Sequence, residues 1–578
     1  MTNCMGKYLS NCAKYNPDGL FMIYGDQRIS WRELNDRVNR LSNALLDLDV
    51  KKGDKVAMMF HNCPEFFETN YAIQKIGAIP VPLNYRFSER EIVYQTNHSD
   101  SIVFIFEDIW LDPVNAAKKN FDGIKHFICS AKNCPDGMLG YEDLIGKHSE
   151  KEPETEVTED DICVICYTGG TTGLPKGVML TYKNHIKLLE TMLTSLIPRL
   201  PDIGISKESK SKIGSVLPIP GIARLIGLIE ARPVRFLLGS PFTQRLVGGL
   251  LKRILGSSIL IRIGKRFDAK VMMPSFPLFH DAAYQLVILG PITGILTFVS
   301  PVSPSFDTKE VLDLIKTEKP IMLGNVPTGW KKLLDYEGID KYDISSVLIA
   351  ATGAGVNPGE LKKKILAHFP GVFIVDVFGQ TEMTPNTTIR IDTDSEKIKD
   401  RSVGKPIVET RIIDDEGNDV KTGEIGEIIY KSPTIMKGYY KEPEKTAEVI
   451  KDGWFYGGDL GYFDEDGEIR IVERKKECIS SGGEKIFPHE VEEIMLTNPK
   501  IKEVCVIGVP DETWGSAVRA VVQLKEGKKA DEREIIDWCR ENMAGYKKPK
   551  SIEFVEAFPV TPVGKIQRGK VKEIYGKP

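Results

Sequence analysis

Short apolar segments of β type alternate with amphipathic helical segments along most of this 578-residue chain, and this alternation constrains the fold most strongly. Examples of the apolar segments are KVAMMF at 55–60, SIVFIFE at 101–107 and GVFIVDVFG at 371–379. Helical periodicity follows in segments such as 31–48 and 358–369. Because strands that alternate with helices form βαβ units, the pattern predicts an α/β fold with helices layered on mainly parallel sheet.

The pattern changes twice toward the C-terminus. After about residue 400, short strands surround Glu-Gly and Asp-Gly turns, as in 411–420 and 461–475, which predicts a β-rich subdomain. A compact mixture of helical and strand patterns begins at residue 475. We therefore predict a large N-terminal domain, 1–474, of α/β layers plus the β-rich subdomain, and a small α+β C-terminal domain, 475–578.

The charge balance and the cysteines argue against several classes of protein. Lys and Arg number 77 against 81 Asp and Glu, a net charge of −4, so no basic field points to nucleic acid. Ten dispersed cysteines and a start without an apolar stretch favour a reduced, cytoplasmic protein. The uncharged segment Ala282–Ser305 contains Gly290-Pro291, which predicts a buried helix followed by a buried strand in place of a membrane span.

Residues 221–270 differ from the rest of the chain in charge. Ten Lys or Arg residues stand there against two acidic residues, interleaved with Leu, Ile, Val and Phe. Such a segment is typical of an amphipathic element on an anionic membrane surface. The alternative is a partly buried insertion whose arginines extend to solvent. We predict an insertion at about 205–270 and leave both explanations open, one of which places the protein peripherally at the inner face of a membrane.

The segment YTGGTTGLPKG, 167–177, carries the strongest local signal. Its glycines let backbone N–H groups approach an anion, its threonine hydroxyls add donors and Lys176 adds positive charge, which together suit a polyphosphate. A Walker A loop needs Gly-Lys-Ser/Thr, whereas Lys176 lies between Pro175 and Gly177. A plain turn is the alternative for a loop of this composition.

Further motifs follow in the order FGQTE (378–382), YGGDLGYFDEDG (456–467), ERKKECISSGGEKIFPHEVE (473–492) and PVTPVGKIQR (559–568). Together with 167–177 they resemble the adenylate-forming superfamily, which includes acyl-CoA synthetases, over nearly the whole chain. The resemblance implies an ATP-dependent acid:CoA ligase. Such an enzyme forms an acyl-adenylate with release of pyrophosphate, and then an acyl-CoA thioester with release of AMP. The implied cofactors are ATP, Mg²⁺ and coenzyme A.

The resemblance assigns a phosphate and metal site. Lys176 holds the ATP phosphates, Thr381 contacts phosphate or carboxylate, and Glu382 binds magnesium. A carboxylate beside phosphates is repulsive unless a cation intervenes, which independently supports magnesium at Glu382. The loop residues implied in phosphate binding are Thr168, Gly169, Gly170, Thr171, Thr172 and Gly173.

The resemblance also assigns the nucleoside site. Adenine packs against Phe378, where the family more often has Tyr, so that stacking is kept while a hydroxyl is lost. Asp459 and Arg474 bind the ribose, and a turn-forming role is the alternative for Asp459. The remaining residues implied around the base are Gly353, Ala354, Gly355, Asp376 and Gly379.

Lys565 is the lysine that the resemblance implies in adenylate formation. Its ammonium stays charged at neutral pH and can reach both the attacking carboxylate and the α-phosphate. In the family, a mobile C-terminal domain then rotates about a hinge, Lys476 here. That rotation replaces Lys565 by a loop whose Gly482 and Gly483 line the pantetheine tunnel. A solvated basic tail is the alternative for Lys565.

The residues that correspond to the family's acyl pocket are His280, Val326, Thr352 and Met383. His280 resembles the residue that gates the route to the CoA tunnel, with a structural histidine as the alternative. A small apolar lining favours a hydrophobic acid, and we expect a medium- or long-chain fatty acid. The alternatives are an alicyclic or aromatic acid, an acceptor on a carrier protein, and an inactive membrane-associated binding protein. The oligomeric state stays open, with a homodimer among the options.

Overall fold

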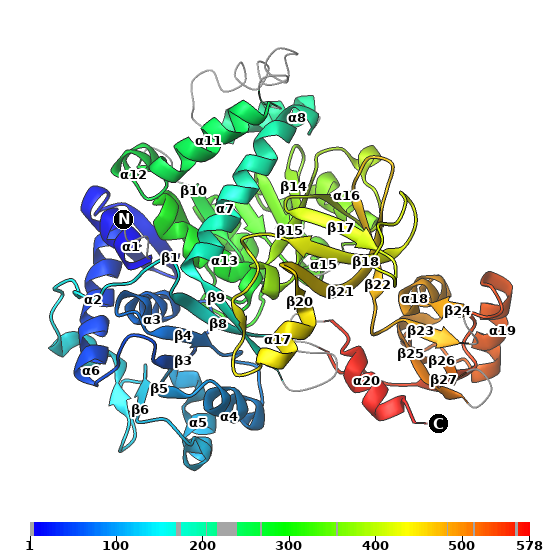
Figure 1. Cartoon of the computed structure of the whole chain (residues 1–578), viewed down its shortest axis with the longest axis horizontal. Helices are drawn as coiled ribbons and strands as arrows, with labels where there is room; N and C mark the ends of the chain where they lie inside the picture. The colour runs from blue at the N-terminus through cyan, green and yellow to red at the C-terminus, as the bar shows by residue number, and fades with distance from the viewer. Residues whose placement is uncertain are drawn as a thin grey trace. The chain divides into compact units, whose positions relative to one another are not determined.

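The computed structural model describes residues 5–168, 175–203, 205–216, 238, 240–265, 269–353, 357–481, 484–511, 515–560 and 565–577 (Figure 1). The chain forms two compact units. The first unit comprises Met1–Thr168, Pro175–Glu409 and Lys431–Gly453, and the second comprises Gly169–Leu174, Thr410–Tyr430 and Trp454–Pro578. The domain limits 1–474 and 475–578, and the insertion at 205–270, stay predictions.

A long, mainly parallel sheet forms the centre of the first unit. Its strands from β14 to β1 are mutually parallel, whereas β16, β15 and β2 are antiparallel to their neighbours. The strand order is β16 (Ser402–Pro406), β15 (Asn386–Asp392), β14 (Phe373–Gly379), β13 (Ile349–Thr352), β12 (Met322–Gly324), β10 (Ala269–Met272), β11 (Leu296–Ser300), β1 (Leu20–Tyr24), β2 (Gln27–Ser30).

One helix connects each successive pair of parallel strands from β10 to β14. These helices are α13 (Asp281–Thr293), α14 (Thr308–Glu318), α15 (Pro327–Leu334) and α16 (Gly359–His368). Trp330 of α15 is fully buried and belongs to one core cluster with Leu312 of α14 and Ile374 of β14. The predicted α/β alternation is therefore confirmed, because the apolar faces of the helices cover the sheet.

A second, fully parallel sheet lies in the N-terminal part of the first unit. Its order is β4 (Ile79–Pro82), β3 (Lys55–Met59), β5 (Ser101–Phe106), β6 (His126–Cys129) and β7 (Leu139–Gly140). The predicted helix 31–48 forms as α2 (Trp31–Asp47), and its N-cap Ser30 accepts a hydrogen bond from the N–H of Glu33. Helix α3 (Pro64–Lys75) is buried along its whole length, as a helix between layers must be.

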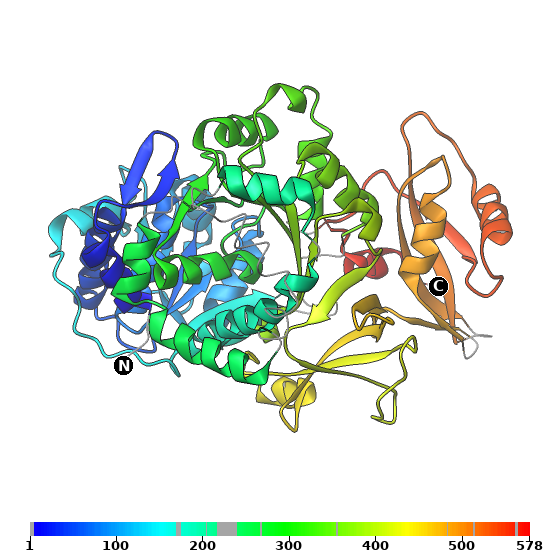
Figure 2. The same cartoon turned by 90° about the horizontal axis from the view of Figure 1, so that it is seen from above.

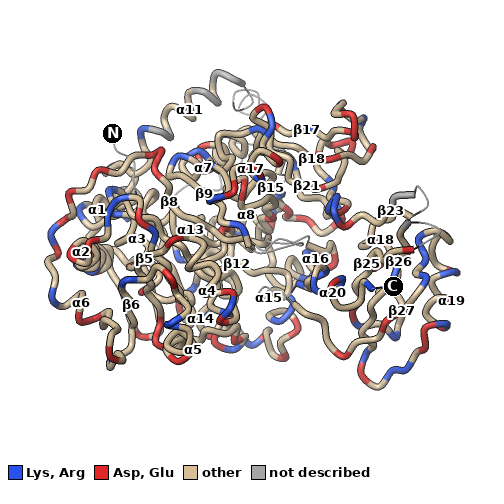
Figure 3. Tube along the Cα trace, turned by 60° about the horizontal axis from the view of Figure 1, so that its bottom comes forward, with Lys and Arg blue, Asp and Glu red and all other residues tan. Residues whose placement is uncertain are grey.

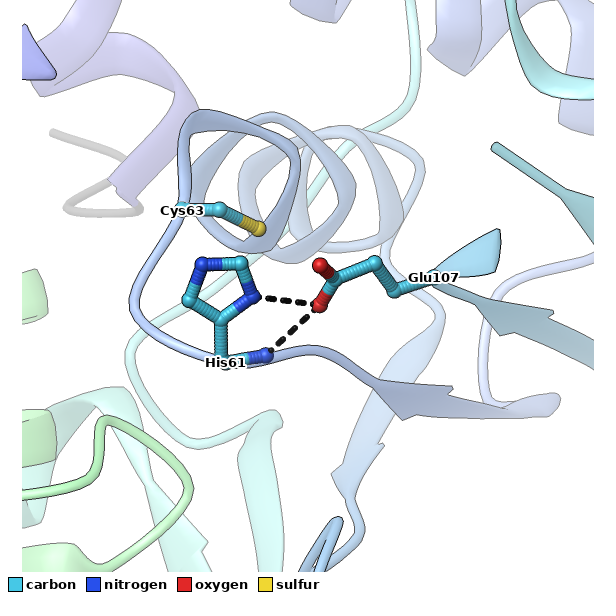
Figure 4. Close-up of side chains that lie close together, drawn as sticks. All are labelled: His61, Cys63 and Glu107. Carbon is cyan, nitrogen blue, oxygen red and sulfur yellow. Dashed lines mark hydrogen bonds and ion pairs between the residues drawn. The ribbon is translucent and has the colours of Figure 1, made fainter. Parts of the chain in front are cut away.

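A buried polar cluster ties the two sheets together (Figure 4). His61 follows β3 and Glu107 follows β5; Glu107 Oε2 accepts hydrogen bonds from the backbone N–H of His61 and from its Nδ1, at 3.1 and 2.5 Å. Tyr24, at the end of β1, places its hydroxyl 2.9 Å from His61 Nε2. Both ring nitrogens of His61 are thus engaged by protein groups. Although the thiol of Cys63 lies nearby, we interpret the cluster as a structural link.

The segment Ala282–Ser305 folds as predicted, into the buried helix α13 and the buried strand β11. Among the residues that the structure describes, no helix is long and apolar enough to cross a membrane. Helix α7 (Tyr182–Leu196) packs beside α11 (Pro241–Ile254), which α12 (Ser258–Gly264) follows (Figures 1 and 2). The remaining helices of this unit include α1 (Met5–Tyr15), α4 (Glu89–His98), α5 (Leu111–Ala117), α6 (Tyr141–Lys147), α8 (Lys207–Val216) and α17 (Pro443–Val449).

Among the residues that the structure describes, the second unit contains two larger sheets and the two-stranded pair of β23 (Ile479–Ser481) and β24 (Glu484–Ile486). The first is antiparallel where β18 (Gly426–Lys431), β21 (Trp454–Phe463) and β22 (Ile469–Arg474) pair, with β17 (Glu409–Ile413) beside β18. The other sheet, orange in Figure 2, has β25 (Ile501–Asp511), β26 (Gly515–Leu524) and β27 (Ser551–Phe554). Helices α18 (Pro488–Leu496), α19 (Glu532–Asn542) and α20 (Arg568–Tyr575) accompany it. This β-rich and α+β composition matches the predicted fold class.

Candidate functional site

Four neighbouring parallel strands bring the predicted acyl-pocket residues to one edge of the larger sheet. β10 leads into 273–280, which ends in His280, β12 leads to Val326, and β13 ends at Thr352. β14 leads to the short turn Thr381–Met383. The carboxyl ends of parallel strands lie at the same edge, which is where open α/β sheets bind ligands. The topology therefore places these segments side by side, while their contact with an acyl group stays a prediction.

The segment before His280 is fixed by the side chain of Asn62, which lies in the loop after β3. Asn62 Nδ2 donates to the carbonyl oxygen of Phe276 at 2.9 Å, and the N–H of Leu278 donates to Asn62 Oδ1 at 2.9 Å. His280 itself caps helix α13, because its Nδ1 accepts from the N–H of Ala282 at 3.3 Å. A neutral imidazole that accepts at Nδ1 carries its proton on Nε2. This structural role accounts for the orientation of His280, and its gating role stays a prediction.

Lys176 and Glu382, the predicted phosphate and metal residues, share one aromatic neighbour. The hydroxyl of Tyr439 donates to Glu382 Oε1 at 2.7 Å. Lys176 Nζ lies 4.6 Å from the centroid of the same Tyr439 ring, a cation–π distance. One tyrosine thus contacts a lysine through its ring and a half-buried carboxylate through its hydroxyl. The oxygen donors of a glutamate suit magnesium, which prefers hard oxygen ligands.

The strands around the predicted phosphate loop explain this arrangement. β8 (Ile162–Thr168) and β9 (Lys176–Thr181) form a hairpin in which Thr168 pairs with Lys176. The two-residue strand β19 (Gly438–Tyr439) pairs with the other edge of β9. The hairpin places Lys176 at the base of the loop, and β19 brings Tyr439 beside it. The loop residues Gly169, Gly170, Thr171, Thr172 and Gly173 lie outside the described residues.

Asp376, predicted to lie near the adenine, is engaged in a buried ion pair. Its Oδ2 lies 2.6 Å from Lys362 Nζ, and its Oδ1 accepts from Asn357 Nδ2 at 2.8 Å. Thr352 extends this network, because its hydroxyl donates to Asn357 Oδ1 at 2.7 Å. Burial raises the pKa of Asp376, and the adjacent Lys362 ammonium counteracts that rise. These contacts give Asp376 and Thr352 structural roles, and their ligand-binding roles stay predictions.

Backbone packing in the FGQTE motif requires a glycine at position 379. Gly379 closes β14, and a Cβ atom there would lie 1.7 Å from the carbonyl oxygen of Pro385, so only glycine fits. Phe378 is half-buried on the same strand, Met383 is fully buried, and Thr381 is half-buried. Gly353 follows β13, whereas Ala354 and Gly355 lie outside the described residues.

In the second unit, three predicted residues form one electrostatic cluster. Asp459 on β21 faces Arg474 on β22, and Asp459 Oδ1 lies 2.7 Å from Arg474 Nε. Arg474 also donates to the carbonyl oxygen of Gly457 at 2.8 Å. Lys565 is exposed, and its charge interacts with the charges of both members of this pair. Partial removal from water and the charge of Arg474 lower the pKa of Lys565, while Asp459 counteracts this effect.

The predicted hinge residue Lys476 is exposed and is the second residue after β22, which ends at Arg474. Both of its neighbours in sequence are held by ion pairs. Lys475 Nζ lies 2.8 Å from Glu427, and Glu477 lies 3.1 Å from Arg568. Gly482 and Gly483 lie outside the described residues, and the roles of all these residues stay predictions.

A buried polar chain beside Glu382 was not predicted from the sequence. Asp281 follows His280 directly; burial raises its pKa well above the ordinary value, and the negative charge of Glu382 raises it further. Gln285 Nε2 lies 3.4 Å from Asp281 Oδ1 and 3.0 Å from His185 Nδ1. Burial lowers the pKa of His185 to about 4, so this imidazole is neutral at pH 7. No motif marks these residues, since Asp281 and Gln285 lie on α13 whereas His185 comes from α7.

Known proteins match the chain over nearly its full length. Residues 9–219 and 249–440 match the family "AMP-binding enzyme", which leaves 220–248 unmatched, and 490–565 match the "AMP-binding enzyme C-terminal domain". Feruloyl-CoA synthase of Amycolatopsis sp is 30% identical over 573 residues, 99% of either chain. The long-chain-fatty-acid–CoA ligase of Bacillus subtilis (strain 168) is 29% identical over 592 residues, 98% of this chain and 93% of that protein.

A solved structure leads to the same family. The Mycobacterium tuberculosis fatty acyl CoA synthetase superposes with a TM-score of 0.69 at 26% identity, over 100% of this chain and 99% of that one. The resemblance inferred from the motifs is thereby confirmed. The chain belongs to the AMP-binding enzyme family, among the adenylate-forming acyl-CoA ligases.

Proposed function

We propose that this enzyme joins a hydrophobic carboxylic acid to coenzyme A at the expense of ATP. A carboxylate oxygen of the acid attacks the α-phosphorus and the bond to pyrophosphate breaks, which gives an acyl-adenylate. The thiolate sulfur of CoA then attacks the acyl carbon, and AMP leaves. The observation that carries the proposal is the arrangement of Lys176 and Glu382 around Tyr439. It supplies a cation and an oxygen ligand at the base of a Gly/Thr-rich loop.

The residue roles follow from the fact that both reactants, the carboxylate and the ATP phosphate, are anions. A carboxylate and an ATP phosphate repel each other, so the protein must neutralise charge and orient the reactants. Lys176 and the loop 168–173 bind the phosphates, Thr381 contacts phosphate or carboxylate, and Glu382 holds the magnesium ion. Magnesium, when bound, supplies further positive charge at the phosphate oxygens.

The second unit supplies the remaining roles in this proposal. Asp459 accepts hydrogen bonds from the ribose hydroxyls, and Arg474, which Asp459 already orients at 2.7 Å, donates to the ribose. Lys565 contacts the carboxylate and the α-phosphate during adenylate formation. Lys476 acts as the hinge between the two half-reactions, and Gly482 and Gly483 face the pantetheine of CoA. The use of ATP and CoA favours a cytoplasmic location.

We assign a medium- or long-chain fatty acid as the substrate. Buried Val326 and Met383 near the carboxyl edge of the sheet are apolar, and the long-chain-fatty-acid–CoA ligase is a relative over 98% of the chain. An aromatic acid is the second candidate, because feruloyl-CoA synthase is 30% identical over 99% of the chain. An apolar lining accepts either a chain or a ring.

Pyrophosphate release from ATP and magnesium tests the proposal. The assay uses short, medium, long, alicyclic and aromatic acids, each with and without CoA. We expect multiple turnovers only with CoA and the highest kcat/KM on one fatty-acid length. A maximum on aromatic acids would replace the substrate assignment, and adenylate that accumulates regardless of CoA would indicate a carrier-protein acceptor. No release with any acid would overturn the ligase assignment.

A further inference from the structure

Helices α11 and α12 expose large apolar side chains next to basic ones. Leu246 and Leu250 of α11 are 62% and 55% exposed, and Ile259 of α12 is 63% exposed. Arg253 of α11, Arg262 of α12 and Lys265, which directly follows α12, are also exposed. We call these six residues the α11–α12 surface. Exposed apolar patches that are rimmed by polar residues mark interaction sites.

The packing of each helix explains why these side chains face outward. Leu246, Leu250 and Arg253 are spaced four and three residues apart, so they follow one face of α11. Gly248 lies on the other face, where a Cβ atom would be 3.5 Å from Thr194 of the neighbouring α7. In α12, Ile261 is fully buried, whereas Ile259, two residues earlier, points to the opposite side. Each helix therefore packs against the protein with one face and exposes apolar side chains on another.

All charged residues in the segment 241–265, which contains both helices, are basic. Residues 241–265 contain Arg245, Lys252, Arg253, Arg262 and Lys265 and no acidic residue. In Figure 3 the described part of α11 accordingly carries blue and no red. Residues 241–248 of this segment belong to the stretch 220–248 that has no match in the family comparison, whereas 249–265 lie in a matched range.

We propose that the α11–α12 surface docks the enzyme on an anionic lipid bilayer. Leu246, Leu250 and Ile259 enter the boundary between headgroups and acyl chains, while Arg253, Arg262 and Lys265 pair with anionic headgroups. A second copy of this chain fits the surface poorly, because a symmetric contact would bring two all-cationic segments together. The proposal does not depend on which acid the enzyme activates.

Sedimentation of the full chain with vesicles tests the proposal. We use phosphatidylglycerol/phosphatidylcholine vesicles and pure phosphatidylcholine vesicles, in 0.1 M and 1 M NaCl. We expect binding to the anionic vesicles at low salt and its loss at high salt, because the Debye length falls from about 10 Å to about 3 Å. Pure phosphatidylcholine should bind at least tenfold more weakly.

Variants separate the two contributions. The double variant Leu246→Gln/Leu250→Gln should weaken binding by on the order of a hundredfold, since burial of each leucine contributes roughly tenfold. Arg253→Glu/Arg262→Glu should abolish the preference for anionic vesicles. The matched control is Ile109→Gln, because Ile109 is 49% exposed but lies between Asp108 and Asp112; it should bind as the parent chain does. Circular dichroism and pyrophosphate release of each variant confirm folding.

Three results would overturn the proposal. The first is the absence of binding to anionic vesicles at 0.1 M NaCl. The second is equal weakening by Ile109→Gln and by the double leucine variant, which would show that binding is not located on this surface. The third is a concentration-dependent dimer that disappears in the double leucine variant, which would assign the surface to a second copy of the chain.

Discussion

Replacing Tyr439 by Phe isolates one hydrogen bond in the candidate site. The variant removes the hydroxyl that donates to Glu382 Oε1 at 2.7 Å and keeps the ring 4.6 Å from Lys176 Nζ. If Glu382 holds magnesium, losing this bond frees the carboxylate to leave its binding orientation. We therefore expect Tyr439→Phe to raise the magnesium concentration required for pyrophosphate release and to lower kcat/KM.

The size of the effect follows from the kind of bond. Hydrogen bonds to charged groups contribute about 1.5–3 kcal/mol, and the half-buried position of Glu382 favours the lower value. About 1.5 kcal/mol corresponds to roughly a tenfold change in an equilibrium constant. Tyr439→Leu also removes the ring beside Lys176, so the cation–π interaction with Lys176, about 0.5–1 kcal/mol, should be lost as well.

The assay is a magnesium titration of pyrophosphate release at saturating acid and CoA. Tyr440→Phe is the matched control, because the hydroxyl of Tyr440 donates to Asp100 Oδ2 at 2.8 Å and not to Glu382. Its magnesium dependence should equal that of the parent enzyme. If Tyr439→Phe and Tyr440→Phe give the same magnesium dependence and the same kcat/KM, the hydroxyl of Tyr439 does not orient Glu382 for magnesium binding, and the prediction is refuted.

Three further predictions concern other parts of the chain. Lys565→Ala should abolish adenylate formation but spare thioester formation from supplied acyl-adenylate. Equal loss of both steps would contradict a role of Lys565 in the first half-reaction alone. Lys362→Met should cost about 3–5 kcal/mol in urea unfolding, because it strips Asp376 of its buried partner at 2.6 Å; adding Asp376→Asn should recover part of this. The pKa of His185 falls from 6.5 in the unfolded chain to about 4 in the fold, so unfolding takes up a proton as the pH drops below 6.5. The parent should therefore lose about 2 kcal/mol more than His185→Gln between pH 7 and pH 5, and parallel losses in urea titrations would contradict a neutral buried imidazole.

The sequence predicted the elements whose burial repeats with a regular period. Helix 31–48 and strand 371–379 formed nearly as expected, because their apolar spacing reports which face is covered. Lys176 and Glu382 were also identifiable, since each lies in a contiguous motif. Tyr439 was not, because it meets them only through β19, a two-residue strand that pairs with β9 from more than 250 positions away along the chain. Such a pairing leaves no local periodicity.

Asp376 shows what a motif alone leaves undetermined. Its place on β14, opposite Thr352 of β13, follows from two strands that the sequence predicts. Its partner Lys362 is the fourth residue of α16, an amphipathic lysine-rich helix in which Lys362, Lys363 and Lys364 are chemically alike. Only the packing of α16 on the sheet decides that the first is buried at 1% exposure and paired with two carboxylates while the next two face solvent. A buried carboxylate must be paired to remain charged. The tertiary fold determines that Lys362 is this partner, and the pairing in turn determines whether Asp376 is available to bind a ligand.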